Sequence, residues 1–484
     1  MTEYLKFVKQ MLIVGSIDLL KLLEVLLILP VITKMLGAEQ YGIWTQLKIT
    51  MSLLVPFTFL GLHESLGRFL PGAKEDEVKE GVYSSSAIVF LVTVILSLLL
   101  IVFAQPASRF FGFEVFYVNF LALLIIFESL NTIFFVVIRA LRDISKYFWF
   151  MALRMVAEII LVILAVFLGY GLYGAVISFL AVRILMFGIL VFYTLKKVGK
   201  KVPQFSVMRD YLKFGLPTMA DHISYWVITS VDRYFIGFLM GIVFVGYYAP
   251  AYSIGTLLNL FLFPIAFMLS IVLPKLFDEN NMAEVKKYLS HSLKYFLLFM
   301  IPSVFGLSLL SKELLLIFST KEISDNAYLV VPFITTSIFL YGLTYFFSQI
   351  LILKKNTKTI ALVWASAALL NFSLNVIFIP KFGILGAAIT TLLAYLCGFL
   401  LMRYFALKEL VFHVDMKFAL KSLFSALMMA LLILLFNPQG LVKVMAFVLM
   451  GALLYGILMF LTKAIDRKEI VFFKNLLLTF NKKA

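Results

Sequence analysis

The sequence predicts an all-α membrane protein with about 14 transmembrane helices, and three observations lead to this fold class. Of its 484 residues, 63% are hydrophobic and only 14% are charged, whereas about a quarter of the residues of a soluble protein are charged. Apolar runs of about 20 residues, the length of a membrane-spanning helix, recur along the chain. These runs are too long for barrel strands of about ten residues, and a bilayer admits only helices or closed barrels.

The predicted helices are apolar runs bounded by charged residues or by proline and glycine. Their ranges are 11–33, 44–63, 82–104, 113–138, 148–168, 172–194, 214–239, 243–273, 291–318, 328–353, 359–379, 383–405, 417–436 and 442–462.

Lysine and arginine are divided unequally between alternate loops. With the N-terminus placed in the cytoplasm, 31 of the 42 basic residues fall on the cytoplasmic side, 6 fall outside and 5 lie within predicted spans. Cytoplasmic loops of membrane proteins carry such an excess. We therefore expect a multi-pass protein of the plasma (inner) membrane with both termini in the cytoplasm. Because topology accounts for the net charge of +16, we expect no nucleic-acid partner.

Several function classes are excluded by composition. The single Cys397 excludes an intramolecular disulfide and a cysteine-based metal site, and the four histidines show no ligand spacing. The first apolar run contains Asp18, Lys21 and Glu24, so we expect no cleavable signal peptide. The predicted outside loops are too short to form a soluble active site. We expect a protein that is not an enzyme and that has no cofactor or metal.

Two pairs of glycine motifs indicate an internal repeat. Leu36–Gly42 and Met240–Gly246 each contain glycines five residues apart, at an offset of 204, while Tyr170–Ala175 and Phe382–Ala387 match at an offset of 212. Repeats of this kind are common in transporters, with the substrate site at the repeat interface. The predicted organisation is a six-helix bundle (1–194), a basic cytoplasmic linker (195–213), a second six-helix bundle (214–405), and two further helices with a cytoplasmic tail (406–484).

Charged residues within spans are costly and need a partner or a wet cavity. Arg154–Glu158 and Asp232–Arg233 are close enough in sequence to neutralise each other. Lys48 lies near the end of its span, where its side chain can extend to the membrane surface. The alternative is that cations line a cavity between the bundles. The cavity candidates are Lys21, Arg154, Arg183 and Lys48.

The repeat adds a hypothesis about these cations. With the two offsets applied, Lys21 aligns with Tyr225, Lys48 with Tyr252, and Arg183 with Tyr395. Arginine and lysine are strong donors to phosphate. The first bundle would then hold a phosphate or pyrophosphate, and the three tyrosines of the second would pack against sugar rings.

Acidic residues within spans are candidates for energy coupling, because they can bind H⁺ or Na⁺ in alternation with a substrate. The candidates are Asp18, Glu24, Asp221 and Asp232.

Five stretches of the chain together resemble a known family. These are Leu36–Gly42, Phe214–Pro217, Asp232–Arg233, Val245–Tyr248 and Asn371–Ala388. They are similar to the polysaccharide-biosynthesis flippases, the O-antigen type translocases of the multidrug/oligosaccharidyl-lipid/polysaccharide exporter superfamily. The resemblance extends over nearly the whole chain, and its motifs are structural turns.

The resemblance implies a V-shaped pair of bundles that works by ion-coupled alternating access. The implied substrate is a polyprenyl-(pyro)phosphate-linked oligosaccharide, carried from the cytoplasmic to the outer leaflet. Implied partners are this lipid-linked saccharide, membrane lipid, a polysaccharide polymerase and glycosyltransferases. A peptidoglycan-precursor (lipid II) flippase stays open, as does a multidrug/cation antiporter of the same superfamily, although central cations argue against the latter. A membrane-embedded polymerase or glycosyltransferase would need a large outside loop.

Overall fold

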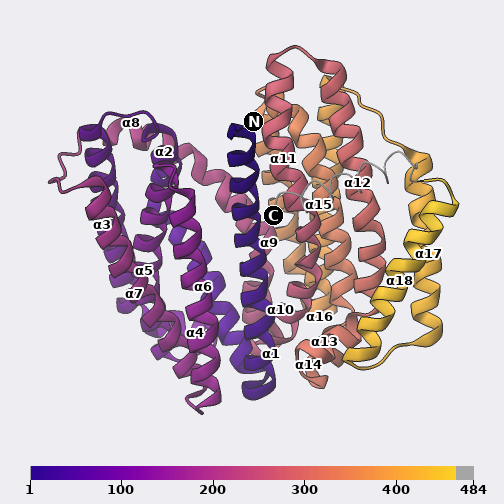
Figure 1. The fold of residues 1–484 in the computed structure, drawn as a ribbon. Helices are drawn as coiled ribbons and strands as arrows, with labels where there is room; N and C mark the ends of the chain where they lie inside the picture. The colour runs from indigo at the N-terminus through magenta and orange to yellow at the C-terminus, as the bar shows by residue number, and fades with distance from the viewer. Residues whose placement is uncertain (1, 465–484) are drawn as a thin grey trace. The chain divides into compact units, whose positions relative to one another are not determined.

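The computed structural model describes residues 2–464, and for residues 2–16, 18, 220–222 and 225 it describes the backbone alone. Every regular element in this part of the chain is a helix (Figure 1), which confirms the all-α prediction. The α-helices are α1 (Thr2–Phe59), α2 (Leu62–Phe69), α3 (Glu75–Val102), α4 (Ala104–Phe111), α5 (Val115–Ala140), α6 (Ile144–Phe167), α7 (Gly171–Val198), α8 (Met208–Gly215), α9 (Met219–Met240), α10 (Ile242–Gly255), α11 (Asn259–Asp278), α12 (Met282–Leu309), α13 (Ser311–Phe318), α14 (Lys321–Ala327), α15 (Val330–Leu353), α16 (Thr357–Glu409), α17 (Met416–Phe436) and α18 (Leu441–Leu461).

The two longest helices are each interrupted by a glycine. The backbone of α1 is non-helical at Gly37, with φ 87° and ψ 180°, and that of α16 is non-helical at Gly383, with φ 61° and ψ −143°. Each of these helices therefore covers two predicted spans that meet at a tight turn.

The glycines of the predicted repeat share one backbone property. Gly37, Gly171, Gly241 and Gly383 all have positive φ, a region that residues with a Cβ atom rarely occupy. Each lies at the turn between two consecutive predicted spans. The four motifs are thus equivalent turns, as the repeat predicts.

Several predicted spans continue past a helix end: 214–239 runs from α8 into α9 and 243–273 from α10 into α11, each through a short 3-10 turn, and two others show an apolar break. The span 44–63 crosses from α1 into α2, where Leu60 and Gly61 have positive φ, and the span 291–318 crosses from α12 into α13 at Leu310. The residues at both breaks are apolar, so hydropathy does not mark them.

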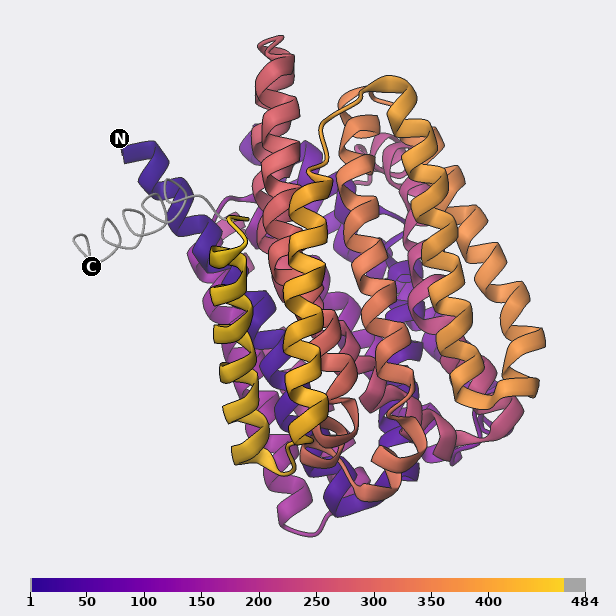
Figure 2. The same cartoon turned by 90° about the vertical axis from the view of Figure 1, so that its right-hand side faces the viewer.

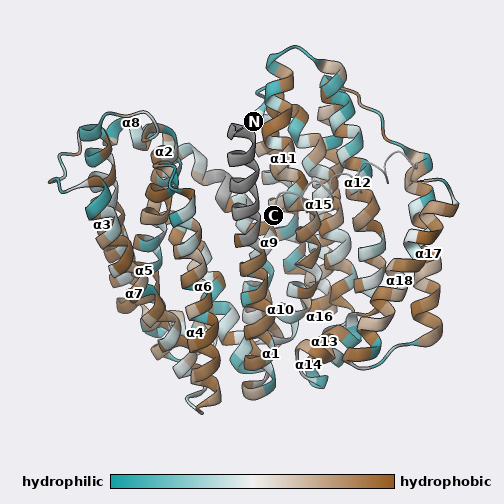
Figure 3. Cartoon of the chain, in the orientation of Figure 1, coloured by the Kyte–Doolittle hydropathy of each residue, from teal (hydrophilic) through white to brown (hydrophobic). Residues whose placement is uncertain are grey.

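The helices have the length and composition of membrane spans. Within the described residues, ten helical stretches are long and apolar enough to cross a bilayer. Figure 3 shows hydrophobic residues along the helices and hydrophilic ones gathered near the connections. The protein is therefore a multi-pass membrane protein.

Contacts divide the chain into two compact units. Unit 1 comprises Met1–Ser253, Phe318–Ala327 and Trp364–Ala394, and unit 2 comprises Ile254–Ile317, Tyr328–Val363 and Tyr395–Ala484. Within unit 2, α17 lies beside α18 (Figure 2) and packs against α12. The units differ from the predicted boundaries at 194, 213 and 405. The structure describes each unit by itself, so those boundaries, the V-shaped arrangement and a cavity between the bundles stay predictions.

Within unit 1, α1 packs against α5, α6, α7 and α9, and it approaches α10 closely. A Cβ atom on Gly42 would lie 2.2 Å from the carbonyl oxygen of Ile242, and one on Gly246 would lie 1.8 Å from that of Ala38. Two motifs of the predicted repeat are thus in backbone contact with each other.

The predicted linker is fixed to the start of α3. The buried carboxylate of Glu80 accepts hydrogen bonds from the backbone N–H groups of Gln204 (3.1 Å) and Ser206 (3.3 Å). Tyr83 donates a hydrogen bond to the carbonyl group of Gly199. The linker is therefore an ordered segment, and α8 forms its last part.

Candidate functional site

Six charged side chains from four helices of unit 1 meet inside the bundle. We call them the charge cluster, and its members are Glu24 and Lys48 of α1, Glu128 of α5, Arg154 and Glu158 of α6, and Arg183 of α7. Three are acidic and three are basic, so the charge cluster is formally neutral.

Glu128 and Glu158 connect the two arginines. The Nε atom of Arg183 lies 3.1 Å from Oε2 of Glu128, and its Nη1 atom lies 2.5 Å from Oε1 of Glu158. Arg154 contacts the same two carboxylates, with Nη1 3.3 Å from Oε1 of Glu128 and Nε 3.4 Å from Oε1 of Glu158. Each arginine is therefore held by two carboxylates from two helices.

The cluster has a buried base and a more open edge. The side chains of Glu158 and Arg183 are 1% and 3% exposed, whereas those of Glu128 and Arg154 are 14% and 13% exposed. Both carboxylate oxygens of Glu158 and the Nε–H group of Arg154 lack a hydrogen-bond partner among the described residues, so ion pairing holds Glu158. Glu128 and Arg154 form the less buried edge of the cluster.

Lys48 belongs to this cluster through Glu24. Its ammonium group lies 3.0 Å from Oε1 of Glu24, which is on the other side of the Gly37 turn in α1. It also lies 5.8 Å from the ring centroids of Trp44 and Phe179. Lys48 is thus paired with a buried carboxylate while its own side chain is 33% exposed, and its extension to the membrane surface stays a prediction.

Packing and one hydrogen bond fix the position of Arg183. Its guanidinium carbon lies 3.5 Å from the ring centroid of Phe179, one turn earlier on α7. The side-chain amide of Asn131 on α5 donates a 2.9 Å hydrogen bond to the backbone carbonyl of Arg183. The arginine is therefore preorganised before any ligand arrives.

A second polar group joins α9 to α10. The buried carboxylate of Asp232 accepts hydrogen bonds from the backbone N–H of Arg233 (2.8 Å), from its Nη1 atom (3.0 Å), and from the hydroxyl of Tyr248 (2.6 Å). The Arg233 guanidinium carbon lies 3.7 Å from the ring centroid of Tyr252, and Arg233 also donates to the carbonyl of Thr229. The predicted Asp232–Arg233 pair is confirmed.

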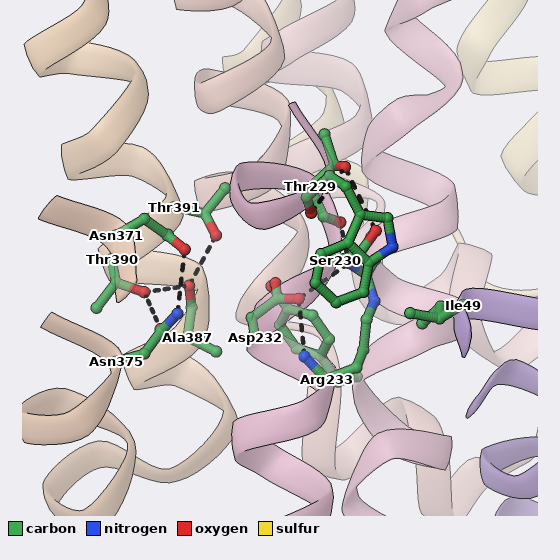
Figure 4. A network of polar contacts seen from close by, with 12 residues as sticks. Ile49, Thr229, Ser230, Asp232, Arg233, Asn371, Asn375, Ala387, Thr390 and Thr391 are labelled. Atoms are coloured by element: carbon green, nitrogen blue, oxygen red, sulfur yellow. Dashed lines mark hydrogen bonds and ion pairs between the residues drawn. The ribbon is translucent and has the colours of Figure 1, made fainter. Parts of the chain in front are cut away.

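A third polar group lies on α16, on both sides of the Gly383 turn (Figure 4). The amide of Asn375 donates to Oδ1 of Asn371 (3.1 Å), and the Thr390 hydroxyl donates to Oδ1 of Asn375 (2.5 Å). Thr390 and Thr391 also donate to the carbonyl of Ala387, at 2.8 and 2.9 Å.

The second and third groups lie on helices that contact each other. The rings of Phe235 on α9 and Phe372 on α16 are 5.1 Å apart, and these residues lie close in sequence to Asp232 and Asn371. Figure 4 shows the two groups in one view. Buried carboxylate, amide and hydroxyl groups thus lie on two contacting helices of unit 1. The oxygens of such groups are the ligands that hard cations prefer.

The structure brings some predicted site residues together and separates others. Arg154, Arg183 and Lys48 lie in the charge cluster, while Lys21 is exposed on α1, three residues before Glu24. Tyr252 is buried under Arg233, and Tyr395 is buried in unit 2 with its ring 5.6 Å from that of Tyr341. A sugar-binding role for these tyrosines stays a prediction. The side chains of Asp18, Asp221 and Tyr225 lie outside the described residues.

Sequence reasoning missed the role of Glu128. The predicted Arg154–Glu158 contact is present, but Glu128 contacts both arginines from a neighbouring helix. An unpaired charge could have indicated this contact. Arg183 has no acidic residue on its own helix, and a cation within a membrane span needs an anion nearby, so a carboxylate from another helix was to be expected.

Comparison with known proteins identifies related chains. Residues 7–274 match the family described as polysaccharide biosynthesis protein, and residues 217–377 match the MatE family. The "Probable low-salt glycan biosynthesis flippase Agl15" of Haloferax volcanii is 23% identical over 368 residues, which cover 74% of this chain and 75% of that relative.

Two solved structures have a similar fold. The lipid II flippase MurJ in an inward closed conformation superposes with a TM-score of 0.76 at 22% identity, covering 97% of this chain and 100% of that one. An inward-facing multidrug resistance MATE family transporter of the MOP superfamily superposes with a TM-score of 0.62 at 17% identity, covering 80% and 95%.

Proposed function

The chain belongs to the polysaccharide biosynthesis protein family, and we propose that it is a flippase for a lipid-linked glycan. In this proposal it carries a polyprenyl-(pyro)phosphate-linked oligosaccharide from the cytoplasmic to the outer leaflet by ion-coupled alternating access. The family match and the flippase name of the Haloferax relative support the transport of a glycan lipid. The process is transport without covalent chemistry.

The observation that carries the proposal is the pair of arginines in the charge cluster. A diphosphate offers several anionic oxygens, and guanidinium groups bind such oxygens through paired N–H donors. Arg154 and Arg183 already hold carboxylates. In the proposed cycle, phosphate oxygens therefore take the place of Glu128, the partly exposed carboxylate that contacts both arginines.

This exchange provides a reason for reversible binding. Glu128 stabilises the arginines when no substrate is bound, so the buried cations are never left without an anion. When the substrate leaves, the carboxylate returns to the arginines and competes against rebinding. A site of permanently free arginines would hold a diphosphate more tightly and release it more slowly.

Ion coupling is part of the same proposal, with Asp232 as the coupling residue. Both described candidates are ion-paired, Glu24 with Lys48 and Asp232 with Arg233. Asp232 is preferred because its helix α9 contacts α16, which carries buried asparagine and threonine side chains whose oxygens are ligands of the kind that Na⁺ prefers. A proton on Asp232 would be the alternative, since both would neutralise the same carboxylate.

Reconstitution into proteoliposomes tests the proposed function. A polyprenyl-diphosphate oligosaccharide with a labelled sugar is placed in both leaflets, and a membrane-impermeant lectin or glycosidase reports how much reaches the accessible face. We expect protein-dependent movement under an imposed Na⁺ or H⁺ gradient. Lipid II and a cationic drug serve as comparison substrates, and preferential transport of the drug would contradict the proposal.

A further inference from the structure

A basic cavity lies between one end of α6 and the adjoining end of α7, in unit 1. Its volume is about 550 Å³. The lysines in its wall are Lys146, in the first turn of α6, and Lys196 and Lys197, in the last turn of α7. All three are exposed. The charge cluster is further along the same helices, so this cavity is separate from the proposed substrate site.

The wall changes from basic to apolar along the helices. Phe150 follows Lys146 by one helical turn, and Ile189 and Phe192 precede Lys196 by one to two turns. Phe192 is 70% exposed, and the neighbouring Trp149 is 64% exposed. This order matches the depth of a bilayer from headgroup to acyl chain. Lysines lie at the helix end, exposed aromatic rings lie beside them, and aliphatic surface follows.

The residues that line this cavity include three lysines and no acidic residue, so the lining carries a net positive charge. The nearest carboxylate along the chain is that of Asp143, and it is already engaged. It accepts a 3.3 Å hydrogen bond from the backbone N–H of Lys146 and a hydrogen bond from the hydroxyl of Tyr193. Among the side chains that the structure describes, none of the three lysines forms an ion pair within this cavity's wall.

The apolar part of the wall is preformed. The rings of Phe150 and Tyr193 are 5.2 Å apart in an edge-to-face arrangement. Phe150, Ile189 and Tyr193 also pack against a buried core that includes Met186 and Leu190. Little side-chain ordering is then needed when a ligand binds.

We propose that this cavity binds an anionic phospholipid of the surrounding bilayer, in addition to the transported lipid. The lysines hold the phosphate headgroup, and an acyl chain lies along Phe150, Ile189 and Phe192. Charge complementarity identifies the headgroup, and the adjoining apolar surface favours a lipid over a soluble phosphate.

Lipid binding to the purified, delipidated protein tests this assignment. Native mass spectrometry counts bound phosphatidylglycerol and phosphatidylcholine for the wild type and for Lys146→Gln/Lys196→Gln/Lys197→Gln. Each lysine near an anionic surface contributes roughly fivefold in affinity, so the triple variant should lose on the order of a hundredfold for phosphatidylglycerol. Phosphatidylcholine binding should not change, and added salt should weaken only the phosphatidylglycerol component.

The matched control is Lys354→Gln/Lys355→Gln/Lys358→Gln, which removes three exposed lysines from the turn between α15 and α16. This control should retain phosphatidylglycerol affinity at the α6–α7 cavity. Lys146→Arg/Lys196→Arg/Lys197→Arg, which keeps the positive charges of the cavity, should retain it too. Equal phosphatidylglycerol affinity in the wild type and the cavity variant would overturn the proposal. So would competition by inorganic phosphate as strong as that by the lipid, which would indicate a site for soluble anions.

Discussion

Glu158 and Arg183 illustrate how single residues determine what this bundle can do. A charged side chain at the centre of a membrane helix costs roughly 2.5–3.5 kcal/mol on insertion scales. In unit 1 the cost is offset by pairing, since three acidic and three basic side chains lie in contact or within electrostatic reach. Removing one partner leaves the other buried and unbalanced.

Removing one charged residue of the cluster should lower the stability of the protein. Arg183→Gln should destabilise the protein by about 3–5 kcal/mol, because it leaves the carboxylate of Glu158 buried without its main counter-charge. Arg183→Gln/Glu158→Gln should recover part of that loss. Thermal unfolding in detergent measures both variants, and a double variant no more stable than the single one would argue against the pairing.

Substrate affinity is the second consequence. Glu128→Gln removes the carboxylate that contacts both arginines and that, in the proposal, competes with phosphate. A polyprenyl diphosphate should therefore bind several-fold more tightly and leave more slowly. Glu284→Gln is the control, because Glu284 belongs to unit 2 and pairs with Lys287 near the start of α12. Binding of a short-chain polyprenyl diphosphate to purified protein provides the measurement. Weaker binding to Glu128→Gln would show that the carboxylate does not compete.

In the proposed cycle, ion coupling depends on Asp232. Asp232→Asn keeps the size of the side chain but removes its charge and leaves Arg233 without its paired carboxylate. In protein that stays folded, transport should no longer respond to the Na⁺ or pH gradient. Substrate binding at the charge cluster should persist, which separates coupling from recognition. Gradient-stimulated transport at the wild-type level in this variant would remove Asp232 from the coupling role.

At the scale of elements, glycines determine how closely helices approach. α1 and α10 meet through Gly42 and Gly246, where carbonyl oxygens occupy the space that a Cβ atom would need. These obstructing atoms belong to the backbone, so no side chain can rotate away. The contact therefore fixes the distance between two turns of the internal repeat.

Gly246→Ala should accordingly destabilise the protein by about 1–3 kcal/mol, the usual range for overpacking. Gly188→Ala is the matched control, because nothing lies within 4 Å of its added Cβ atom on α7. There we expect no loss, since alanine is the better helix former. A similar melting temperature for both variants would mean that α1 and α10 can separate without cost.

The sequence alone predicted most of the helices and their turns, but few of the contacts in the candidate site. The bilayer fixes the length of each apolar run, so the spans and the turns at Gly37 and Gly383 were visible in advance. The contact of Arg183 with Glu128 joins residues 55 positions apart on different helices. Hydropathy does not reveal which helix faces which neighbour, and neither the bridging Glu128 nor the Lys48–Glu24 pair could be predicted.

Topology is a prediction about the whole molecule. The distribution of basic residues places both termini in the cytoplasm. Cys397 is the single cysteine, so Cys397→Ser gives a background for introduced cysteines at Arg109 and Lys287. An impermeant maleimide should label Arg109→Cys in intact cells and Lys287→Cys only after permeabilisation. The reverse pattern would invert the topology.

Transport by Arg154→Gln tests the central claim most directly, because Arg154 lies at the more open edge of the charge cluster. The experiment compares movement of a polyprenyl-diphosphate glycan in proteoliposomes by this variant and by Arg139→Gln, which alters an exposed arginine at the end of α5. Losing a charge-assisted contact worth about 1.5–3 kcal/mol should slow transport by roughly ten- to a hundredfold. Arg139→Gln should match the wild type. Wild-type transport by folded Arg154→Gln would contradict phosphate binding by the charge cluster.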